Sequence, residues 1–226
     1  MKFLTPIFIC ALFVLVAYGL MRLSLFISST AARRKILSYG KASEETVAAL
    51  LMSHFGASNV ICNRYLPYRT QNGIGYTEVD CIVILKGRIA VIEVKSLVGS
   101  IYNPPSETWH QSAVMRNGER KELDFINPIM QNARHVSALS RILKSAKITP
   151  APKIESLVIF TSTRAVFTYE RQKEIYTLSE AVKKLKAMNG GRRFRLRDRM
   201  KIFHAIKKHA KSRRQAMAAT GKKRRR

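Results

Sequence analysis

The stretch Glu78–Lys95 reads EVDCIVILKGRIAVIEVK and decides the fold. Two apolar, β-branched runs flank Lys86-Gly87, a pattern that is typical of a β-hairpin with a tight turn. If those two residues form the loop, pairing outward along the strands places Asp80 opposite Glu93. The sequence therefore predicts an antiparallel pair of strands at the centre of the protein.

The open end of this predicted hairpin gathers charged residues on one face. Side chains alternate between faces with period two, so Glu78, Asp80, Glu93 and Lys95 share a face. Like charges directly opposite each other are destabilising, and two facing carboxylates need a cation or a shared proton. Mg²⁺ prefers such oxygen ligands. The alternative is a solvent-exposed edge without function, with Glu78 and Lys95 as an ordinary ion pair.

The composition of the chain limits the classes of partner that it can bind. The chain has 226 residues, enough for one ordinary domain plus extra segments, and a net charge of +27. Such a charge attracts polyanions, either nucleic acid or an anionic membrane surface. From Lys183 onward, 19 Lys and Arg residues face one acid, Asp198, so this part carries +18. Three cysteines exclude a disulfide framework, and their spacing does not indicate zinc.

The N-terminus predicts a membrane anchor within residues 1–30. The 18 residues of Phe3–Leu20 carry no charge, close to the roughly 20 apolar residues that span a bilayer. Only Lys2 precedes this segment, whereas the basic run Arg33–Lys35 follows it, which places the rest of the chain in the cytoplasm. The alternative is a cleaved signal peptide with its small-residue site at Ser29–Ala32.

A helix is predicted after the anchor, with Ser43 as its N-cap and Gly56 just past its end. Its core stripe consists of Val47, Leu50, Leu51 and Phe55. Glu44 lies three residues before Val47 and continues the inward face. From its position alone, this acid either faces inward as a site residue or simply complements the helix dipole.

Further elements follow along the chain. We expect a strand at Val60–Leu66, a Gly-rich loop at Tyr68–Tyr76, a hairpin around Asn117-Gly118, a helix opened by Asn127-Pro128, a strand at Ile154–Thr161 and a helix at Ser179–Met188. The buried stripe expected on the helix after Asn127 is Ile129, Ala133, Val136, Leu139 and Leu143. Mixed elements around a hairpin predict an α/β core with a central sheet.

Asp80, followed after twelve residues by Glu93-Val94-Lys95, resembles the D…ExK signature of the PD-(D/E)XK nuclease superfamily. The surroundings resemble one branch of it, the nuclease-related domain (NERD) family, over about residues 38–165. The matching positions are Gly40, Glu44, Glu78-Val79-Asp80, Glu93-Val94-Lys95, Gly99, Ile101, Trp109 and Asn127-Pro128-Ile129-Met130-Gln131. The resemblance implies a restriction-endonuclease-like core, in which helices flank a central mixed sheet.

The same resemblance implies a metal-dependent hydrolysis of phosphodiester bonds, with Mg²⁺ as the cofactor and Mn²⁺ as the alternative. The implied catalytic residues are Glu44, Asp80, Glu93, Lys95 and Gln131. Asp80 and Glu93 would hold the metal, helped by the Val94 carbonyl. Lys95 would stabilise developing negative charge or position the attacking water. Glu44 would orient a metal-bound water or supply another ligand, and Gln131 would orient water or a phosphate.

The C-terminal part is strongly basic. Arg192–Arg214 can form a basic helix with Leu196, Met200, Phe203 and Ala210 on one side, and Lys222–Arg226 is a pure charge run. The residues expected to bind nucleic acid are Arg192, Arg193, Arg195, Arg197, Arg199, Lys207, Lys208, Lys211, Arg213 and Arg214. Contact with anionic lipid is the alternative use of this charge.

These features predict four segments: the anchor at 1–30, a NERD-like nuclease domain at 31–165, its C-terminal extension at 166–189 and a basic helix and tail at 190–226. We expect a single-pass protein of a bacterial inner membrane whose cytoplasmic domain cuts nucleic acid, with DNA as the expected substrate. The competing hypothesis is a non-catalytic, membrane-tethered nucleic-acid-binding or scaffold protein that works through its basic tail.

Overall fold

The computed structural model describes residues 15, 18, 21, 22, 38–71, 73–115, 118–190 and 193–221. The chain divides into two units, Met1–Ala42 and Ser43–Arg226. Among the described residues, no helix is both long and apolar enough to cross a membrane. The anchor predicted at residues 1–30 lies outside them except for four positions.

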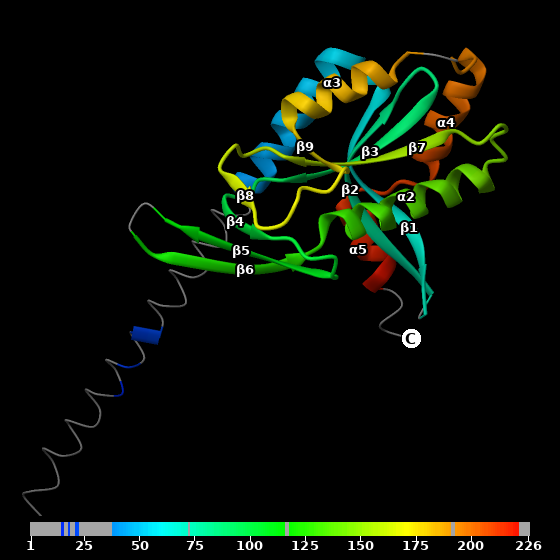
Figure 1. The fold of residues 1–226 in the computed structure, drawn as a ribbon. Coiled ribbons are helices and arrows are strands. Elements are labelled where there is room, and N and C mark those ends of the chain that lie inside the picture. The colour runs from blue at the N-terminus through cyan, green and yellow to red at the C-terminus, as the bar shows by residue number, and fades with distance from the viewer. Residues whose placement is uncertain are drawn as a thin grey trace, which may run out of the picture. The chain divides into compact units, whose positions relative to one another are not determined.

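The second unit is an α/β structure of two sheets and several helices (Figure 1). Its strands are β1 (Val60–Thr70), β2 (Gly73–Ile84), β3 (Arg88–Lys95), β4 (Gly99–Tyr102), β5 (Thr108–Val114), β6 (Arg120–Ile126), β7 (Lys153–Phe160), β8 (Ala165–Phe167) and β9 (Ile175–Thr177). Its helices are residues 43–55 of a helix that begins at residue 38, the short η1 (Ala57–Asn59), α2 (Pro128–Ser145), α3 (Leu178–Met188), α4 (Leu196–His209) and α5 (Arg213–Gly221).

The central sheet is mixed and has the order β1-β2-β3-β7-β9. Strands β1, β2 and β3 are antiparallel, whereas β3, β7 and β9 run parallel to one another. The second sheet has the order β6-β5-β4-β8. A mixed central sheet flanked by helices is the architecture expected of a restriction-endonuclease-like core.

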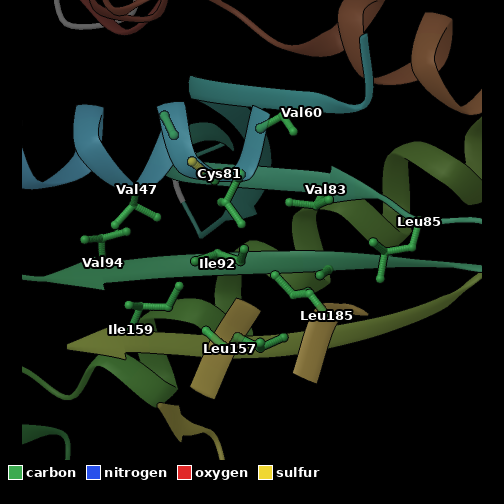
Figure 2. Packing of buried hydrophobic residues seen from close by; sticks show 14 residues of the cluster. Val47, Val60, Cys81, Val83, Leu85, Ile92, Val94, Leu157, Ile159 and Leu185 are labelled. Carbon is green, nitrogen blue, oxygen red and sulfur yellow. The ribbon is translucent and has the colours of Figure 1, made fainter. Parts of the chain in front are cut away.

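Both faces of the central sheet are buried. On one face, side chains of β2, β3 and β7 pack against the helix at 38–55 and against α3, and Figure 2 shows this cluster, with Val47 and Leu185 from the two helices. On the other face, alternate residues of the same strands pack against α2 and α4. This double burial explains why Glu78–Lys95 reads as nearly continuous apolar runs rather than as an alternating pattern.

The second sheet packs against the central sheet through Trp109, which is fully buried with Val158 and Phe160. The indole Nε1 donates a hydrogen bond to the Pro104 carbonyl at 2.9 Å, so the only tryptophan packs in the core. Close strand approach requires glycine at Gly99, which has φ 81°. A Cβ there would lie 2.4 Å from the Ser112 carbonyl oxygen.

The first helix and the first hairpin differ from expectation at their ends. Ser43 is not an N-cap, because residues 38–55 are helical and Ser43 lies inside this run. The predicted end at Gly56 is confirmed by its φ of 85°. The prediction of a loop at Tyr68–Tyr76 is wrong, because β1 extends to Thr70 and β2 begins at Gly73. Aromatic and β-branched residues in this stretch outweighed the glycines.

Two predicted apolar faces are rotated. Along α2, Ala133 is exposed and the buried set includes Asn132 and His135. Apolar spacing alone defined the predicted stripe, so it did not include a buried asparagine and a buried histidine. Along α4, Leu196 and Met200 are 73% and 53% exposed, respectively. The buried residues of α4 are Ile202, Ala205 and Ile206, which pack with α2 in the core.

Candidate active site

The β2–β3 hairpin has the predicted register at its turn end and opens at the other end. Cys81 pairs with Ile92, as a two-residue loop at Lys86-Gly87 requires, and the ladder ends there. The Asp80 side chain then crosses to β3, where its Oδ2 accepts a hydrogen bond from the Val94 backbone N–H at 2.7 Å. A carboxylate thus takes the place of a backbone carbonyl and fixes Asp80 against β3.

Strand β2 is also released from its other neighbour at this point. In the ladder between β1 and β2, Cys62 pairs with Cys81 and Arg64 pairs with Val79, so Asn63 and Asp80 between them are left out of the pairing. Asn63 has φ 51°, a left-handed conformation that asparagine tolerates better than most residues. Backbone strain of this kind concentrates at functional sites. The ladder interruptions on both sides therefore give Asp80 a distinct position in an otherwise regular sheet.

Glu93, Lys95 and Gln131 form a short polar chain beside Asp80. The Lys95 ammonium donates to Glu93 Oε1 at 2.7 Å and to Gln131 Oε1 at 3.2 Å. Glu93 and Lys95 lie two residues apart and therefore on the same face of β3. Gln131 contacts Lys95 from the first turn of α2. This helix begins where the Asn127 side chain accepts a hydrogen bond from the Ile129 N–H at 3.0 Å. The Asn127 N-cap fixes the start of α2 and therefore the position of Gln131 in its first turn.

Three carboxyl groups of the site have raised pKa values. The pKa of Glu93 rises to about 8, because of burial first and the nearby Asp80 second. Burial raises the pKa of Asp80 to about 6, and burial together with Asp80 and Glu78 raises the pKa of Glu44 to about 7. Lys95 opposes all three shifts without cancelling them. Burial, the largest cause in each case, therefore favours the protonated forms more than Lys95 favours the ionised ones.

His135 lies beneath this cluster and was not assigned a role from the sequence. Its Nδ1 is 3.5 Å from Glu93 Oε2. Burial, Lys95 and Arg134 lower the pKa of His135 to about 4, so the imidazole is neutral at pH 7. Among the described residues, neither Nδ1 nor Oε2 has a hydrogen-bond partner. One oxygen of Glu93 is thus buried without a donor.

Asn132 holds α2 against the sheet beneath the site. Its side-chain Nδ2 lies 2.9–3.0 Å from the Val91 carbonyl, the Ser156 hydroxyl and the Leu157 carbonyl. This amide is fully buried. Because α2 carries Gln131 and His135 one residue before and three residues after it, these contacts fix where both side chains meet β3.

Glu44 reaches the site from the helix at 38–55, on the other face of the sheet. Burial raises its pKa most, and the charges of Asp80 and Glu78 raise it further. Tyr65 of β1 pairs with Glu78 in the ladder. Burial first, and then the interaction with Glu78, raise the pKa of Tyr65 to about 12. Only the strand register reveals that Tyr65 lies beside Glu78, so the sequence pattern did not indicate it.

Hydrogen bonds hold four of the five predicted catalytic residues at the hairpin opening, and Glu44 interacts with Asp80 and Lys95 electrostatically from the first helix. Asp80 and Glu93 offer two carboxylates at the hairpin opening, Lys95 and Gln131 stand beside them, and Glu44 adds charge from the first helix. No group of three or more His, Cys, Asp or Glu side chains is arranged as a metal site among the residues that the structure describes.

A comparison with family models classifies the chain. Residues 39–161, more than half of the chain, match the nuclease-related domain model. The chain belongs to the NERD family. All five residues of the candidate site lie inside the matched NERD region. No curated protein and no solved structure matches the chain.

The predicted nucleic-acid-binding residues follow the NERD region, and the structure divides them. Arg192 lies outside the described residues. Exposed members are Arg193, Arg195, Arg197, Lys207, Lys208, Arg213 and Arg214. Two are partly buried and engaged in the fold: Arg199 hydrogen-bonds to the Asn59 side chain, and Lys211 pairs with β1.

The pairing of Lys211 carries the C-terminal segment to the edge of the central sheet. Tyr65 and Lys211 exchange two backbone hydrogen bonds of 3.0 and 2.9 Å. The Lys211 ammonium also lies 4.8 Å from the centre of the Tyr76 ring. The charge of Arg213, two residues further on, partly offsets the rise in the pKa of the Tyr65 phenol. The start of α5 is therefore held near Glu78, at the same end of the sheet as the candidate site.

Proposed function

We propose that this NERD protein is a Mg²⁺-dependent nuclease that hydrolyses phosphodiester bonds, with DNA as its substrate and Mn²⁺ as an alternative cofactor. The observation that carries the proposal is the opening of the β2–β3 hairpin. There, two carboxylates and one ammonium face the same space on adjacent strands, with their donors and acceptors fixed by hydrogen bonds. A core that otherwise buries apolar side chains gains no stability from this group.

The residues present fit a hard divalent cation. Asp80 and Glu93 have raised pKa values, and Glu93 Oε2 is buried without a hydrogen-bond donor among the described residues. Mg²⁺ is commonly bound by one or two carboxylates and keeps several waters, so a pair of acids is sufficient. Bound there with help from the Val94 carbonyl, it would polarise a phosphate oxygen and lower the pKa of a coordinated water.

The protein's own groups would do the remaining work. The Lys95 ammonium, held 2.7 Å from Glu93, would donate to the phosphate oxygen on which negative charge develops or would position the attacking water. Gln131 would orient that water or the phosphate, since its amide already contacts Lys95. Glu44, with a pKa of about 7, would hold or release a proton near neutral pH and help to orient the water.

The basic C-terminal segment supports a nucleic-acid substrate. The Lys211 bridge holds the start of α5 at the edge of β1, so the exposed Arg213 and Arg214 stand at the site end of the sheet. A nucleic-acid backbone bound to these side chains would pass close to Glu78. Contacts of this kind give affinity without sequence preference and weaken as salt rises.

We further propose that residues 1–30 tether the enzyme to a bacterial inner membrane, with the NERD domain in the cytoplasm. The uncharged run Phe3–Leu20 and the basic residues after it support this orientation. Along α4, the exposed Leu196 and Met200 adjoin Arg197 and Lys201 in one hollow. Apolar groups next to cations suit an anionic lipid surface, so this helix is a candidate for a second membrane contact.

The test is a cleavage assay with the full-length protein in detergent. Plasmid DNA, single-stranded DNA and RNA are incubated with Mg²⁺, Mn²⁺ or EDTA, and the products are separated on gels. We expect cleavage with either metal and none with EDTA. Glu93→Ala and Lys95→Ala should abolish it, whereas Glu170→Gln, an exposed acid outside the site, should leave it unchanged.

A non-catalytic nucleic-acid-binding protein is the competing function, and the exposed arginines of α4 and α5 favour it. It predicts that wild type and Glu93→Ala shift nucleic acid equally and that neither cuts it. Arg213→Glu/Arg214→Glu would then abolish the shift. Equal binding without metal-dependent cutting would overturn the nuclease proposal.

A further inference from the structure

Two free thiols face each other beside the candidate site. Cys62 of β1 and Cys81 of β2 are direct partners in the antiparallel ladder. Their sulfur atoms are 2.8 Å apart, and both cysteines are free thiols. Two cysteines brought into register on neighbouring strands, 19 residues apart in sequence, lie much closer than two small core residues need to be.

The strand register is compatible with a disulfide. Directly opposed residues of an antiparallel pair have Cα atoms about 4.5–5.5 Å apart. Disulfides are found with Cα separations of roughly 4.4–6.8 Å and a sulfur–sulfur bond of about 2.05 Å. The two sulfurs therefore need to approach by less than about 1 Å, which side-chain rotation provides without moving either strand.

The two thiols differ in exposure. Cys81 is 1% exposed and belongs to the cluster between the sheet and the helix at 38–55, where Figure 2 shows it near Val47. Cys62 packs against the same cluster but is only partly buried. A small oxidant therefore meets Cys62 first, and Cys81 is the shielded partner that can react with the oxidised sulfur.

We propose that Cys62 and Cys81 are a redox modification site that forms a reversible intramolecular disulfide with a peroxide as oxidant. The Cys62 sulfur attacks one peroxide oxygen, the O–O bond breaks, and the thiol proton leaves with the departing oxygen as water. The Cys81 sulfur then displaces the hydroxyl of the Cys62 sulfenic acid, and a second water leaves with its proton. The two sulfurs lose two electrons, which the peroxide accepts.

The bond would act next to the point where the ladder is interrupted. Cys81 directly precedes the end of β2–β3 pairing and adjoins Asp80, while Cys62 adjoins the left-handed Asn63. A covalent link between β1 and β2 would restrict the opening of this end of the sheet. The inference rests on the register and on the two sulfurs, and it holds whether or not the site cuts nucleic acid.

The test uses the full-length Cys10→Ser protein in detergent, so that Cys62 and Cys81 are its only thiols. The reduced protein is treated with hydrogen peroxide, denatured, alkylated with N-ethylmaleimide and weighed by mass spectrometry. We expect a monomer about 2 Da lighter than the reduced chain that takes up no maleimide, and dithiothreitol should restore two reactive thiols.

Single replacements provide the matched controls. Cys62→Ser and Cys81→Ser, each combined with Cys10→Ser, should keep one thiol and show no loss of 2 Da. Oxidation of the two-thiol protein should also raise Tm on the order of 5–10 °C, an effect that both single-thiol controls lack. Two alkylatable thiols after peroxide, sulfinic acid on Cys62 without a bond, or a disulfide between two molecules would each overturn the proposal.

Discussion

The two ends of the β2–β3 hairpin are built from the same strands and behave in opposite ways. At the turn end, Ile84 pairs with Ile89 and the flanking side chains are almost completely buried. At the open end, Asp80 and Glu93 are nearly as buried but are ionisable groups with raised pKa values. The comparison shows that burial alone does not separate structural from functional residues. The side chains at the turn end stabilise the fold, whereas those at the open end cost stability and, in the function that we propose, provide the chemistry.

The largest effect should come from breaking the turn end. Ile89 is fully buried between the sheet and α2. Ile89→Ala should lower the free energy of unfolding by about 2–5 kcal/mol, because it removes apolar contacts and leaves a cavity. Urea unfolding followed by circular dichroism measures this. Ile126→Ala, at a side chain that is 48% exposed, serves as the control and should cost much less. Equal losses would mean that the turn end is not the stabilising end.

At the open end, the largest effect should fall on activity instead. Lys95→Met keeps the length of the side chain but removes the ammonium that contacts Glu93 and Gln131. We expect cleavage to slow by about 10²–10³-fold while the protein stays folded, since one charge-stabilising donor is lost. Initial rates on plasmid DNA measure the effect, with the exposed Lys173→Met as the control. A loss of less than tenfold would exclude Lys95 from the reaction.

The pH dependence of stability should sharpen the contrast. Folded Glu93 has a pKa of about 8 against an ordinary value of 4.5. The contribution of this group to stability is fully present below pH 4.5 and is lost as the pH rises through 8. The raised pKa of Glu44 acts in the same direction up to about pH 7. The lowered pKa of His135 makes stability rise with pH instead, but only between about pH 4 and pH 6.5. In EDTA, Tm should therefore fall from pH 6.5 to 8.5.

Glu93→Gln tests the origin of this slope. The amide keeps the shape of the side chain without its charge, so the fall in Tm between pH 6.5 and 8.5 should become shallower. Mg²⁺ should raise the Tm of the wild type more at pH 8 than at pH 6.5, because the ionised carboxylates bind it better. A variant whose Tm falls as steeply as that of the wild type would show that Glu93 is not the titrating group.

The smallest expected effect concerns Gln131. Its contact with Lys95 is 3.2 Å long, longer than the contact between Lys95 and Glu93. Gln131→Ala should reduce cleavage by roughly tenfold, in keeping with the modest value of a single neutral hydrogen bond. Met130→Ala, at the neighbouring exposed position, should change the rate by less than twofold. A loss as large as that of Lys95→Met would instead make Gln131 a principal group.

The hairpin was predictable because its signal is local. A two-residue loop between β-branched runs sets the register, and that register correctly places Cys81 opposite Ile92. The point at which the pairing of β2 and β3 ends does not depend on local sequence. The hydrogen bond from Val94 to Asp80 exists because the ladder stops, and a pairing pattern extended along both strands does not show where it stops.

The helices show the same limit. Gly56 and Asn127 mark helix ends through side-chain and backbone chemistry within a few residues, and both predictions are confirmed. The faces of α2 and α4 depend on what packs against them. Asn132 is buried because it finds three partners on β3 and β7, which no spacing of apolar residues reveals. The position of Tyr65 beside Glu78 likewise follows from the strand register.

The integration of α4 into the core has a practical consequence for any shortened form of this protein. Ile202 and Ile206 fill the space above α2, and Lys211 occupies the free backbone edge of β1. Cutting the chain before residue 196 would remove basic charge, but it would also uncover an apolar groove and an unpaired strand edge. Such a fragment is prone to aggregate. The basic residues are best studied by reversing individual charges in a chain of full length.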